Sequence, residues 1–540
     1  MVTIGDKRRK SGSRPARHVP EGEAPAVRVA VLGCGTVGGA VVRLLVAEAD
    51  EIAERSGVRL ELVAVAVADP GRPRQGVPPG LLTTEAAALV TDPGIDIVVE
   101  LIGGLEPAHD LVTAALASGK AVVTANKALI AAHGAALADA AAAAGVDLLY
   151  EAAVAGAIPI VRPLRESLAG ERVRRVTGIV NGTTNFILSV MGEGDVTYEA
   201  ALAEAQHLGY AERDPSADVD GHDAAAKAAI LASLAFRCAV VDADVTRQGI
   251  GGIPAEDVAS ARRLGFVVKL LAVAELAGDG RLSVRVHPAL VRDDHPLAAV
   301  RGAFNAVFVE GDWCGELMLY GRGAGGVPTA SAVLGDVIDA ALNRQQGAAA
   351  PAPARSRTRL LPLHDVRCPF YLSLEVADQP GVLAAVAAVF GRHQVSIRSM
   401  EQDGLGDEAR LIFLTHTARD GDVHDTLTEL AGLPAVRHVG AVLRVLDGDR
   451  SATLHAAGPQ TADLEAGDLV AGDLVAGDLA AGDQLVPAVP ETPAPATTTT
   501  GAATAAPVNA AVSTGAVPPG AAAVAPAVPV GADPRGTDRT

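Results

Sequence analysis

Cysteine is scarce in this chain of 540 residues, which contains only four, and no two of them form a Cys-x-x-Cys pair. This scarcity argues against a disulfide framework and against a cysteine zinc site. The histidines likewise lack the His-x-His and His-Glu-x-x-His spacings of histidine zinc sites. The pattern predicts a protein of a reducing compartment, the cytoplasm.

Positive charge and long apolar runs are also in short supply. The chain has 45 Lys and Arg against 64 Asp and Glu, a formal net charge of −19, which disfavours sequence-independent binding to nucleic acid. No apolar run of about 18 residues, the length that spans a bilayer, is free of charge and proline. The nearest candidate, residues 266–278, contains Lys269 and Glu275. We therefore expect neither nucleic acid nor membrane as a partner.

The two ends of the chain lack the side chains that build a core. Residues 451–540 contain no Phe, Trp, Tyr or Lys, so little there can offset the entropy cost of ordering. A five-residue AGDLV-like repeat begins at Ala466 but is too short to stack as a solenoid. We predict a disordered, low-complexity tail over residues 448–540 and a disordered extension over residues 1–25.

Between these ends, apolar runs alternate with helical patterns. The first run, Val27–Leu32, leads into a glycine-rich turn and then a helical pattern. Four more runs follow, at residues 60–67, 95–102, 121–124 and 146–150. This alternation predicts an α/β fold with a doubly wound parallel sheet over residues 26–160.

The glycine-rich turn matches the dinucleotide fingerprint Gly-x-Gly-x-x-Gly. Its glycines let the backbone approach a pyrophosphate, and the amides of the following helix face the negative charge. The position of the motif between a strand and a helix strengthens the prediction of a Rossmann-type site. The residues concerned are Gly33, Gly35, Thr36, Val37 and Gly38.

The sequence leaves the choice between NAD and NADP open. The expected acidic residue after the second strand is Asp69, 31 residues past Gly38 rather than the usual ~20. A first helix that continues through Glu54 would account for the delay. Arg72 and Arg74 follow and could either accept a 2′-phosphate or lie solvated in their loop.

Residues 208–227 contain five carboxylates and one lysine. We predict Asp220 as the N-cap of a helix on which Asp223 and Lys227 are i, i+4 neighbours. As an isolated pair they would be an ordinary surface ion pair. A calcium loop is excluded, because Lys227 stands where the bidentate glutamate is required.

Several motifs, taken together, resemble the homoserine dehydrogenase family over residues 26–447. The matching segments are residues 33–38, 124–128, 181–185, 208–227 and 321–332. The resemblance implies an NAD- or NADP-dependent oxidoreductase that interconverts L-homoserine and L-aspartate 4-semialdehyde in threonine, methionine and isoleucine biosynthesis. It also implies an α+β substrate and dimerisation domain over residues 161–345, a return helix at 328–343, and a homodimer or homotetramer.

The resemblance also assigns the candidate active-site residues. Lys227 would exchange a proton with the substrate oxygen, Asp223 would orient it, and Lys127 would lie near both the nicotinamide and the substrate. The substrate-binding residues would be Glu212, which suits the α-ammonium group, together with Thr183 and Asp218.

A monovalent cation site, usually sodium, is implied next to the nucleotide domain. Its ligands would be the side chain of Glu151 and the carbonyls of Val154, Gly156 and Ile158. From the residues alone, this segment is equally typical of a strand that passes into a loop.

Residues 368–447 resemble an ACT domain, a small α+β module that senses amino acids. A strand at 370–376 is followed by the turn at 378–383 and a helix that ends near His393. Threonine is the implied effector, and a purely structural module is the alternative. Residues 346–367 read as a linker, so we expect the ACT module to fold separately and to be removable near residue 350 without loss of activity.

Two other classes of protein are disfavoured by particular residues. Aspartate-semialdehyde dehydrogenase needs a nucleophilic cysteine in a reactive setting, and no cysteine here has one. A catalytically inactive sensor of nucleotide and amino acid, with the same fold, is the other alternative. The presence of Lys127, Glu212, Asp223 and Lys227 argues against it.

Overall fold

The computed structural model describes residues 26–194, 196–350, 359–404 and 406–446. The predictions made for residues 1–25 and 448–540 lie outside this part of the chain. No helix of the described residues is long and apolar enough to cross a membrane. The four cysteines, all within the described residues, form no disulfide.

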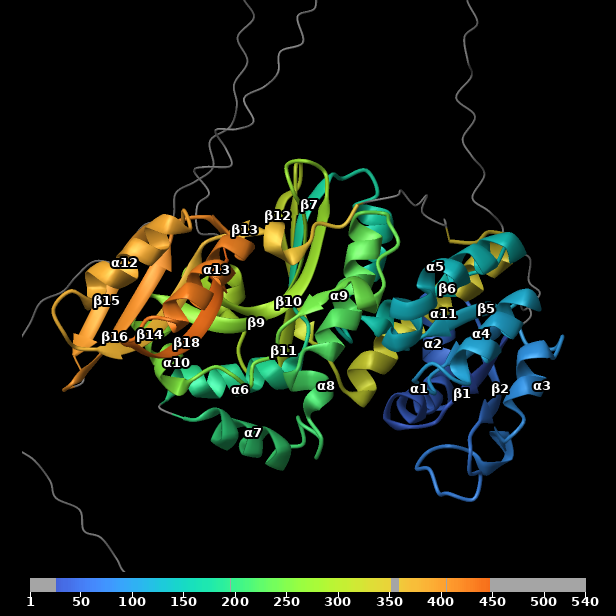
Figure 1. The fold of residues 1–540 in the computed structure, drawn as a ribbon. Coiled ribbons are helices and arrows are strands. Elements are labelled where there is room, and N and C mark those ends of the chain that lie inside the picture. Colours follow the sequence, from blue (N-terminus) through green and yellow to red (C-terminus); the bar gives the residue numbers. More distant parts are fainter. Residues whose placement is uncertain (1–25, 195, 351–358, 405, 447–540) are drawn as a thin grey trace, which may run out of the picture. The chain divides into compact units, whose positions relative to one another are not determined.

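A six-stranded parallel sheet forms the nucleotide domain, in the strand order β3-β2-β1-β4-β5-β6. Its central strands β1, β4 and β5 are buried except at Arg28, as expected for a sheet covered by helices on both faces, whereas β2 and β3 towards one edge are largely half-buried (Figure 1). The doubly wound prediction is confirmed. The strands are β1 (Val27–Leu32), β2 (Leu60–Ala66), β3 (Leu82–Thr83), β4 (Ile97–Glu100), β5 (Ala121–Thr124) and β6 (Leu148–Leu149). The helices are α1 (Thr36–Ala47), α2 (Ala49–Ser56), α3 (Ala86–Thr91), α4 (Ala108–Ala117) and α5 (Lys127–Ala144).

The expected single first helix is wrong, because the chain breaks between α1 and α2 at Glu48. Asp50 and Glu51 lie in the first turn of α2, where they favour a new helix N-terminus. Ile52 is buried, and Gly57 ends the helix in the left-handed conformation. Two short helices, rather than a long one, separate the glycine turn from Asp69.

The substrate domain is a mixed sheet with helices packed on it. Its long strands β9 and β10 pair antiparallel over eleven residues each. The strands are β7 (Val173–Ile179), β8 (Thr246–Arg247), β9 (Phe266–Leu276), β10 (Leu282–Arg292), β11 (Phe304–Gly311) and β12 (Gly315–Arg322). The helices are α6 (Gly182–Glu193), α7 (Tyr198–His207), α8 (Ser216–Val219), α9 (His222–Ala235) and α10 (Ala255–Arg263).

The return helix is α11 (Gly326–Gln346), which follows the substrate domain in sequence but packs on the nucleotide domain. Val333 and Val337 are fully buried in one cluster with Val31 and Val41. The helix continues to Gln346, three residues beyond the predicted end at residue 343, and Gly347 then ends it in the left-handed conformation. The nucleotide domain is therefore completed by a distant part of the chain.

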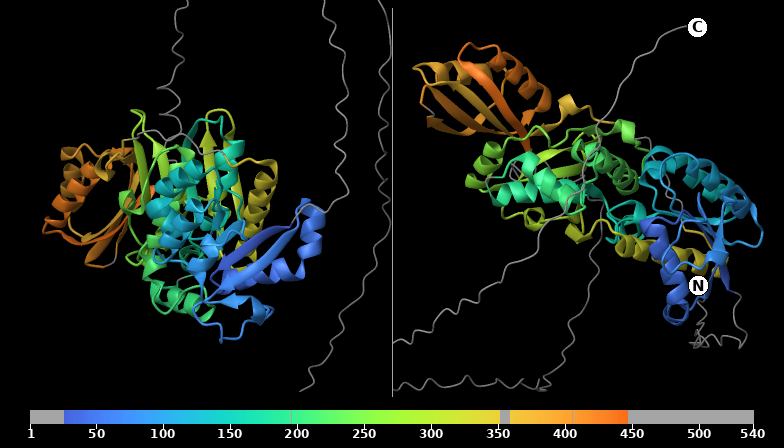
Figure 2. Two further views of the ribbon diagram at one scale, coloured as in Figure 1. Left: turned by 90° about the vertical axis from the view of Figure 1, so that its right-hand side faces the viewer. Right: turned by 90° about the horizontal axis from the view of Figure 1, so that it is seen from below.

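The ACT module has four main antiparallel strands with two helices on one face, an arrangement that persists in the views of Figure 2. Phe370, Leu372 and Leu374 face these helices and meet Val386 and Phe390 in a closed core. The elements are β13 (Arg367–Cys368), β14 (Phe370–Ala377), α12 (Val382–Arg392), β15 (Ile397–Gly404), β16 (Glu408–Thr415), β17 (Ala418–Arg419), α13 (Asp420–Ala431) and β18 (Val436–Val445).

The expectation of a separately folding ACT module is contradicted by strand pairing. β18 runs parallel to β10, with Ala289 opposite Arg444, so that both domains share one ten-stranded sheet. The end of the predicted linker is also structured, because Leu360 bridges to Leu282 and Asp365 pairs with Arg281. Pairing with β18 satisfies backbone groups at the edge of β10 that would otherwise lack a strand partner. The sequence of the linker does not indicate that this pairing forms.

Candidate active site

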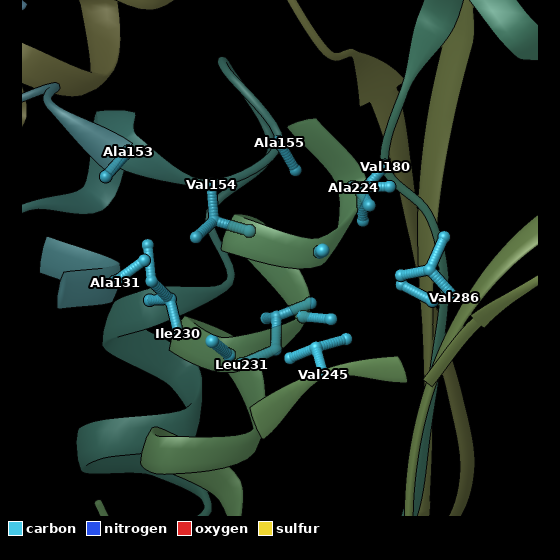
Figure 3. Close-up of a cluster of buried hydrophobic side chains, with 14 of the residues drawn as sticks. Ala131, Ala153, Val154, Ala155, Val180, Ala224, Ile230, Leu231, Val245 and Val286 are labelled. Atoms are coloured by element: carbon cyan, nitrogen blue, oxygen red, sulfur yellow. The ribbon is translucent and has the colours of Figure 1, made fainter. Parts of the chain in front are cut away.

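Helix α9 carries the two central charged side chains of the site, Asp223 and Lys227. It begins at His222, after Gly221 with φ +83°, whereas Asp220 closes α8. The prediction of Asp220 as N-cap is therefore wrong, because the reversal at Gly221 separates it from α9. Buried apolar residues fix the helix, and Figure 3 shows Leu231 close to Val245 and Ile230 beside Ala131. Asp223 and Lys227 therefore project from a rigid support.

Asp223 joins groups from three parts of the chain. Its Oδ1 accepts a hydrogen bond from Lys127 Nζ, and its Oδ2 accepts from Lys227 Nζ at 2.8 Å and from Asn181 Nδ2 at 2.9 Å. The carboxyl is almost fully buried. Burial alone would raise the pKa of Asp223, but the Lys227 and Lys127 cations hold that pKa well below its usual value. Asp223 is therefore an ionised anchor for two ammonium groups.

The two lysines differ in access to solvent. Lys227 Nζ also donates to the carbonyl of Val180 at 2.7 Å, and its side chain is 12% exposed. The Lys127 side chain, at the start of α5, is 44% exposed. Lys227 is thus held by two acceptors in a shielded position, while Lys127 remains open to a ligand.

Asn181 is a site residue that the sequence analysis did not single out. Its Oδ1 caps α6 by accepting from Thr184 N at 2.9 Å, and its Nδ2 also donates to Asp218 Oδ1 at 2.6 Å. Asp218 is thereby linked to Asp223 through one amide. The Asn-Gly-Thr motif could have indicated this residue, because an asparagine before a helix is a preferred N-cap.

The predicted substrate-binding residues are only partly brought together. Thr183 Oγ1 donates to the carbonyl of Tyr210 at 2.8 Å, which ties α6 to the loop that carries Glu212. Glu212 is exposed, and within the described segments no hydrogen bond or ion pair engages its carboxylate. Its carboxylate is therefore available to a ligand, while its position relative to Asp223 is set only by the loop.

The glycine turn has the shape that a pyrophosphate needs. A Cβ at Gly33, where φ is +96°, would lie 2.5 Å from the carbonyl oxygen of Leu101, and one at Gly38 would lie 2.2 Å from that of Gly33. Above Gly35, by contrast, a Cβ would meet nothing within 4 Å. The first turn of α1 contains no acidic residue and no side-chain cap. The amides of Thr36 and Val37 and the open space fit a dinucleotide.

Arg74 lies beside this turn. Its guanidinium donates to the carbonyls of Cys34 at 3.4 Å, Asp69 at 2.9 Å and Arg72 at 2.8 Å. The Asp69 carboxylate accepts from Gly71 N at 2.9 Å, and Arg72 is exposed. Two cationic side chains thus follow the carboxyl end of β2, where the ribose of a dinucleotide is held in this fold.

The Glu151 side chain faces the backbone of the turn that follows it. Its Oε1 accepts from the amides of Ile160 at 2.6 Å and Val161 at 2.8 Å, and its Oε2 accepts from Arg162 N at 2.8 Å. Three backbone donors thus make this carboxylate the cap of the following helical turn, and its role as a cation ligand stays a prediction. Ala155 and Gly156 have φ values of 56° and 57°. The carbonyl groups of the predicted set come from this turn.

Family models match almost the whole described chain. The homoserine dehydrogenase model matches residues 159–338, the model of its NAD-binding domain matches residues 33–151, and the ACT domain model matches residues 370–435. The fold and the glycine turn therefore belong to an NAD(P)-dependent oxidoreductase that carries an ACT domain.

Full-length relatives make the assignment specific. The homoserine dehydrogenase of Corynebacterium glutamicum is 50% identical over 442 residues, which cover 81% of this chain and 99% of the relative. That of Mycobacterium tuberculosis is 49% identical over 435 residues, covering 78% and 98%. The chain belongs to the homoserine dehydrogenase family and has NAD(P)-dependent homoserine dehydrogenase activity, as the resemblance implied.

Solved structures agree. The homoserine dehydrogenase of Thiobacillus denitrificans has a TM-score of 0.74 and 40% identity, and the match covers 78% of this chain and 98% of that chain. A hyperthermophilic archaeal homoserine dehydrogenase mutant in complex with NADPH has a TM-score of 0.50 and 31% identity, and the match covers 59% of this chain and 98% of that chain.

Proposed function

We propose that Lys227 transfers the proton at the substrate oxygen and that Asp223 holds it in place. When bound, the nicotinamide would accept a hydride from the carbon that bears the hydroxyl. When homoserine is oxidised, the neutral amine of Lys227 accepts the hydroxyl proton, and in the reverse direction its ammonium donates that proton to the aldehyde oxygen. The observation that carries this proposal is the buried Asp223, which binds Lys227 at 2.8 Å and Lys127 with its other oxygen.

Lys127 has a different role in this proposal. Its exposed ammonium, on the opposite side of the Asp223 carboxylate from Lys227, stabilises negative charge on the substrate oxygen. Asp218 positions Asn181, which in turn binds Asp223. Lys227 is thus fixed by a chain of hydrogen bonds. Among the described residues Lys127 is held by Asp223 alone, and its partly exposed side chain can meet the ligand.

We expect Glu212→Gln to raise the KM for homoserine roughly tenfold, with kcat less affected, because the carboxylate provides the counter-charge of the substrate ammonium. Steady-state kinetics with homoserine as the varied substrate measure the effect. Glu204→Gln, on the exposed side of α7, is the matched control. An unchanged KM for homoserine together with weaker cofactor binding would show that Glu212 contacts the cofactor and not homoserine.

We propose NADP as the preferred cofactor, with its 2′-phosphate near Arg72 and Arg74. The solved relative that contains NADPH supports this assignment. We expect Arg72→Ala to lower kcat/KM for NADP about tenfold and to leave kcat/KM for NAD within about twofold, since only NADP carries the extra phosphate. Arg55→Ala, on the exposed end of α2, serves as control. Equal losses with both cofactors would contradict the assignment.

A monovalent cation at the turn after β6 is part of the proposal, with the carbonyls of Val154, Gly156 and Ile158 as ligands. The successive left-handed residues Ala155 and Gly156 support it, because they turn carbonyls out of regular structure. Hard carbonyl oxygens suit an alkali ion. Titration of Na⁺ into protein kept in choline buffer, followed by the melting temperature, tests it.

For regulation, we propose that ACT modules of two chains pair and that threonine binds at the turn before α12. All residues of the edge strand β15 are exposed except the half-buried Ile397. The exposed apolar side chains include Met400 on this strand and Leu383 on α12. Gly381, with φ +91°, opens α12 without a side-chain cap. A paired edge would contribute to the homodimer or homotetramer.

We expect Asp378→Ala to raise the threonine concentration for half-inhibition about tenfold or more while the uninhibited rate stays unchanged, since Asp378 lies far from the lysines in sequence and is exposed. Inhibition curves at fixed homoserine measure this. A chain that ends at residue 450 is the control and should be inhibited like the full chain. Full inhibition of the Asp378→Ala variant would show that threonine does not use this turn.

The cytoplasm is the compartment that we propose for the chain. The four cysteines, all among the described residues, form no disulfide, and Cys238 is buried. Unpaired thiols are typical of a reducing compartment.

A further inference from the structure

A polar cavity lies where the helix-free face of the ACT sheet meets α10 of the substrate domain. Its volume is about 220 Å³. Its charged and polar lining comes from two domains and consists of Glu256 and Asp257, Ser373 and Glu375, Arg410 and His438. None of these residues belongs to the lysine site or to the turn before α12.

Two buried polar atoms of this lining have no partner among the described residues. Ser373 is 2% exposed, and its Oγ makes no hydrogen bond. Arg410 donates from Nη2 to Asp257, but its buried Nε is also without a partner. An unsatisfied buried group costs about 1–3 kcal/mol, so two in one cavity call for a ligand or ordered water.

The backbone explains why this space exists. The pairing of β14 with β18 shifts register between Leu372 and Leu374, and the resulting bulge turns the amide of Ala441 towards Asp257 Oδ2 at 3.0 Å. Gly440 lies opposite Ser373, and a Cβ there would come within 2.3 Å of Ser373 Oγ. Any larger residue at Gly440 would fill the approach to the hydroxyl.

The chemistry of the lining specifies the ligand. The N–H of Arg410 Nε and the hydroxyl of Ser373 are donors that suit a carboxylate. The carboxylates of Glu375 and Glu256 suit an ammonium group, and they would repel a simple anion. The volume far exceeds the ~10–15 Å³ that a single water needs. These features together describe a small zwitterion.

We propose that this cavity is a second amino-acid site, which binds the α-carboxylate of a free L-amino acid through Ser373 and Arg410 and its α-ammonium through Glu375. The site is independent of the threonine turn described above. A ligand here contacts both the ACT sheet and α10, and it acts on the catalytic domain by favouring the arrangement in which both contacts form.

The test uses the full chain and the twenty common L-amino acids, added one at a time, with the melting temperature as the measurement. We expect at least one amino acid to stabilise the wild type and the Asp378→Ala variant equally. Ser373→Ala and Glu375→Gln should each weaken its binding about tenfold or more. Acetate and ethanolamine, which carry one half of the zwitterion each, should give no shift.

Two exposed positions of the ACT module provide matched controls. Ser396→Ala and Glu408→Gln should bind like the wild type. Without ligand, Ser373→Ala should melt at or above the wild-type temperature, because it removes a hydroxyl that has no partner. If no amino acid gives a shift that depends on Ser373 and Glu375, the cavity holds only water and the proposal is wrong. A shift lost only in Asp378→Ala would assign binding to the turn instead.

Discussion

Lys227→Ala should lower kcat by about 10² or more and leave the KM for the cofactor within about twofold, the pattern expected when a general acid–base group is lost. The reason is the shielded position of Lys227, where Asp223 at 2.8 Å and the carbonyl of Val180 at 2.7 Å fix its amine. Within the described part of the chain no other ammonium shares this geometry, since Lys127 binds the opposite oxygen of Asp223. Steady-state rates in both directions measure the loss.

Lys227→Arg separates proton transfer from charge. An arginine keeps a cation beside Asp223 but retains its proton at any working pH. We therefore expect its melting temperature to lie close to that of the wild type while its kcat stays as low as that of the alanine variant. Near-normal turnover in either variant would remove Lys227 from the chemistry.

Local patterns in the sequence predicted much of the nucleotide domain. β1 and β5 have the predicted bounds, since Gly33 marks the end of the first run and Lys120 precedes the second. The short edge strand β3 was missed, since two residues carry no periodicity. The break at Glu48 was missed because no glycine or proline marks it: Glu48 lies between Ala47 and Ala49, and all three are good helix formers.

Local sequence patterns did not predict the contacts between residues far apart in the chain. Lys127 meets Asp223 across 96 positions, and only the family resemblance placed them in one site. The Glu151 carboxylate caps a turn that begins nine residues later, which no spacing rule predicts. Its role as a helix cap depends on how the backbone folds back.

The junction between the ACT module and the substrate domain is the largest difference from expectation. A chain that ends near residue 350 would lose β18, the neighbour of β10, and the Tyr371, Arg410 and Ala441 partners of the Asp257 carboxylate. We now expect this truncation to destabilise the catalytic domain, so that loss of threonine inhibition in it would be uninformative. Point variants such as Asp378→Ala are the better test of regulation.

Asp257→Asn should lower the free energy of unfolding by about 3 kcal/mol or more, since removal of one partner from a buried ion pair leaves the other charge uncompensated. Asp257 is 0% exposed and accepts from Tyr371 OH at 2.6 Å, Arg410 Nη2 at 2.5 Å and Ala441 N at 3.0 Å. Denaturant and thermal unfolding of the full chain measure the effect. Dehydrogenase activity well below the melting temperature should persist, because the partners of the Asp257 carboxylate, Tyr371, Arg410 and Ala441, all lie in the ACT module.

The matched control joins the same two domains at the surface. Asp403 and Arg263 form an exposed pair at 3.5 Å, so Asp403→Asn should cost less than about 1 kcal/mol. Replacing both buried charges, in Asp257→Leu with Arg410→Met, should recover part of the stability lost in Asp257→Asn, because no unpaired charge remains. If Asp257→Asn is as mild as Asp403→Asn, the two domains are held by strand pairing and apolar contact alone, and the buried carboxylate does not stabilise their junction.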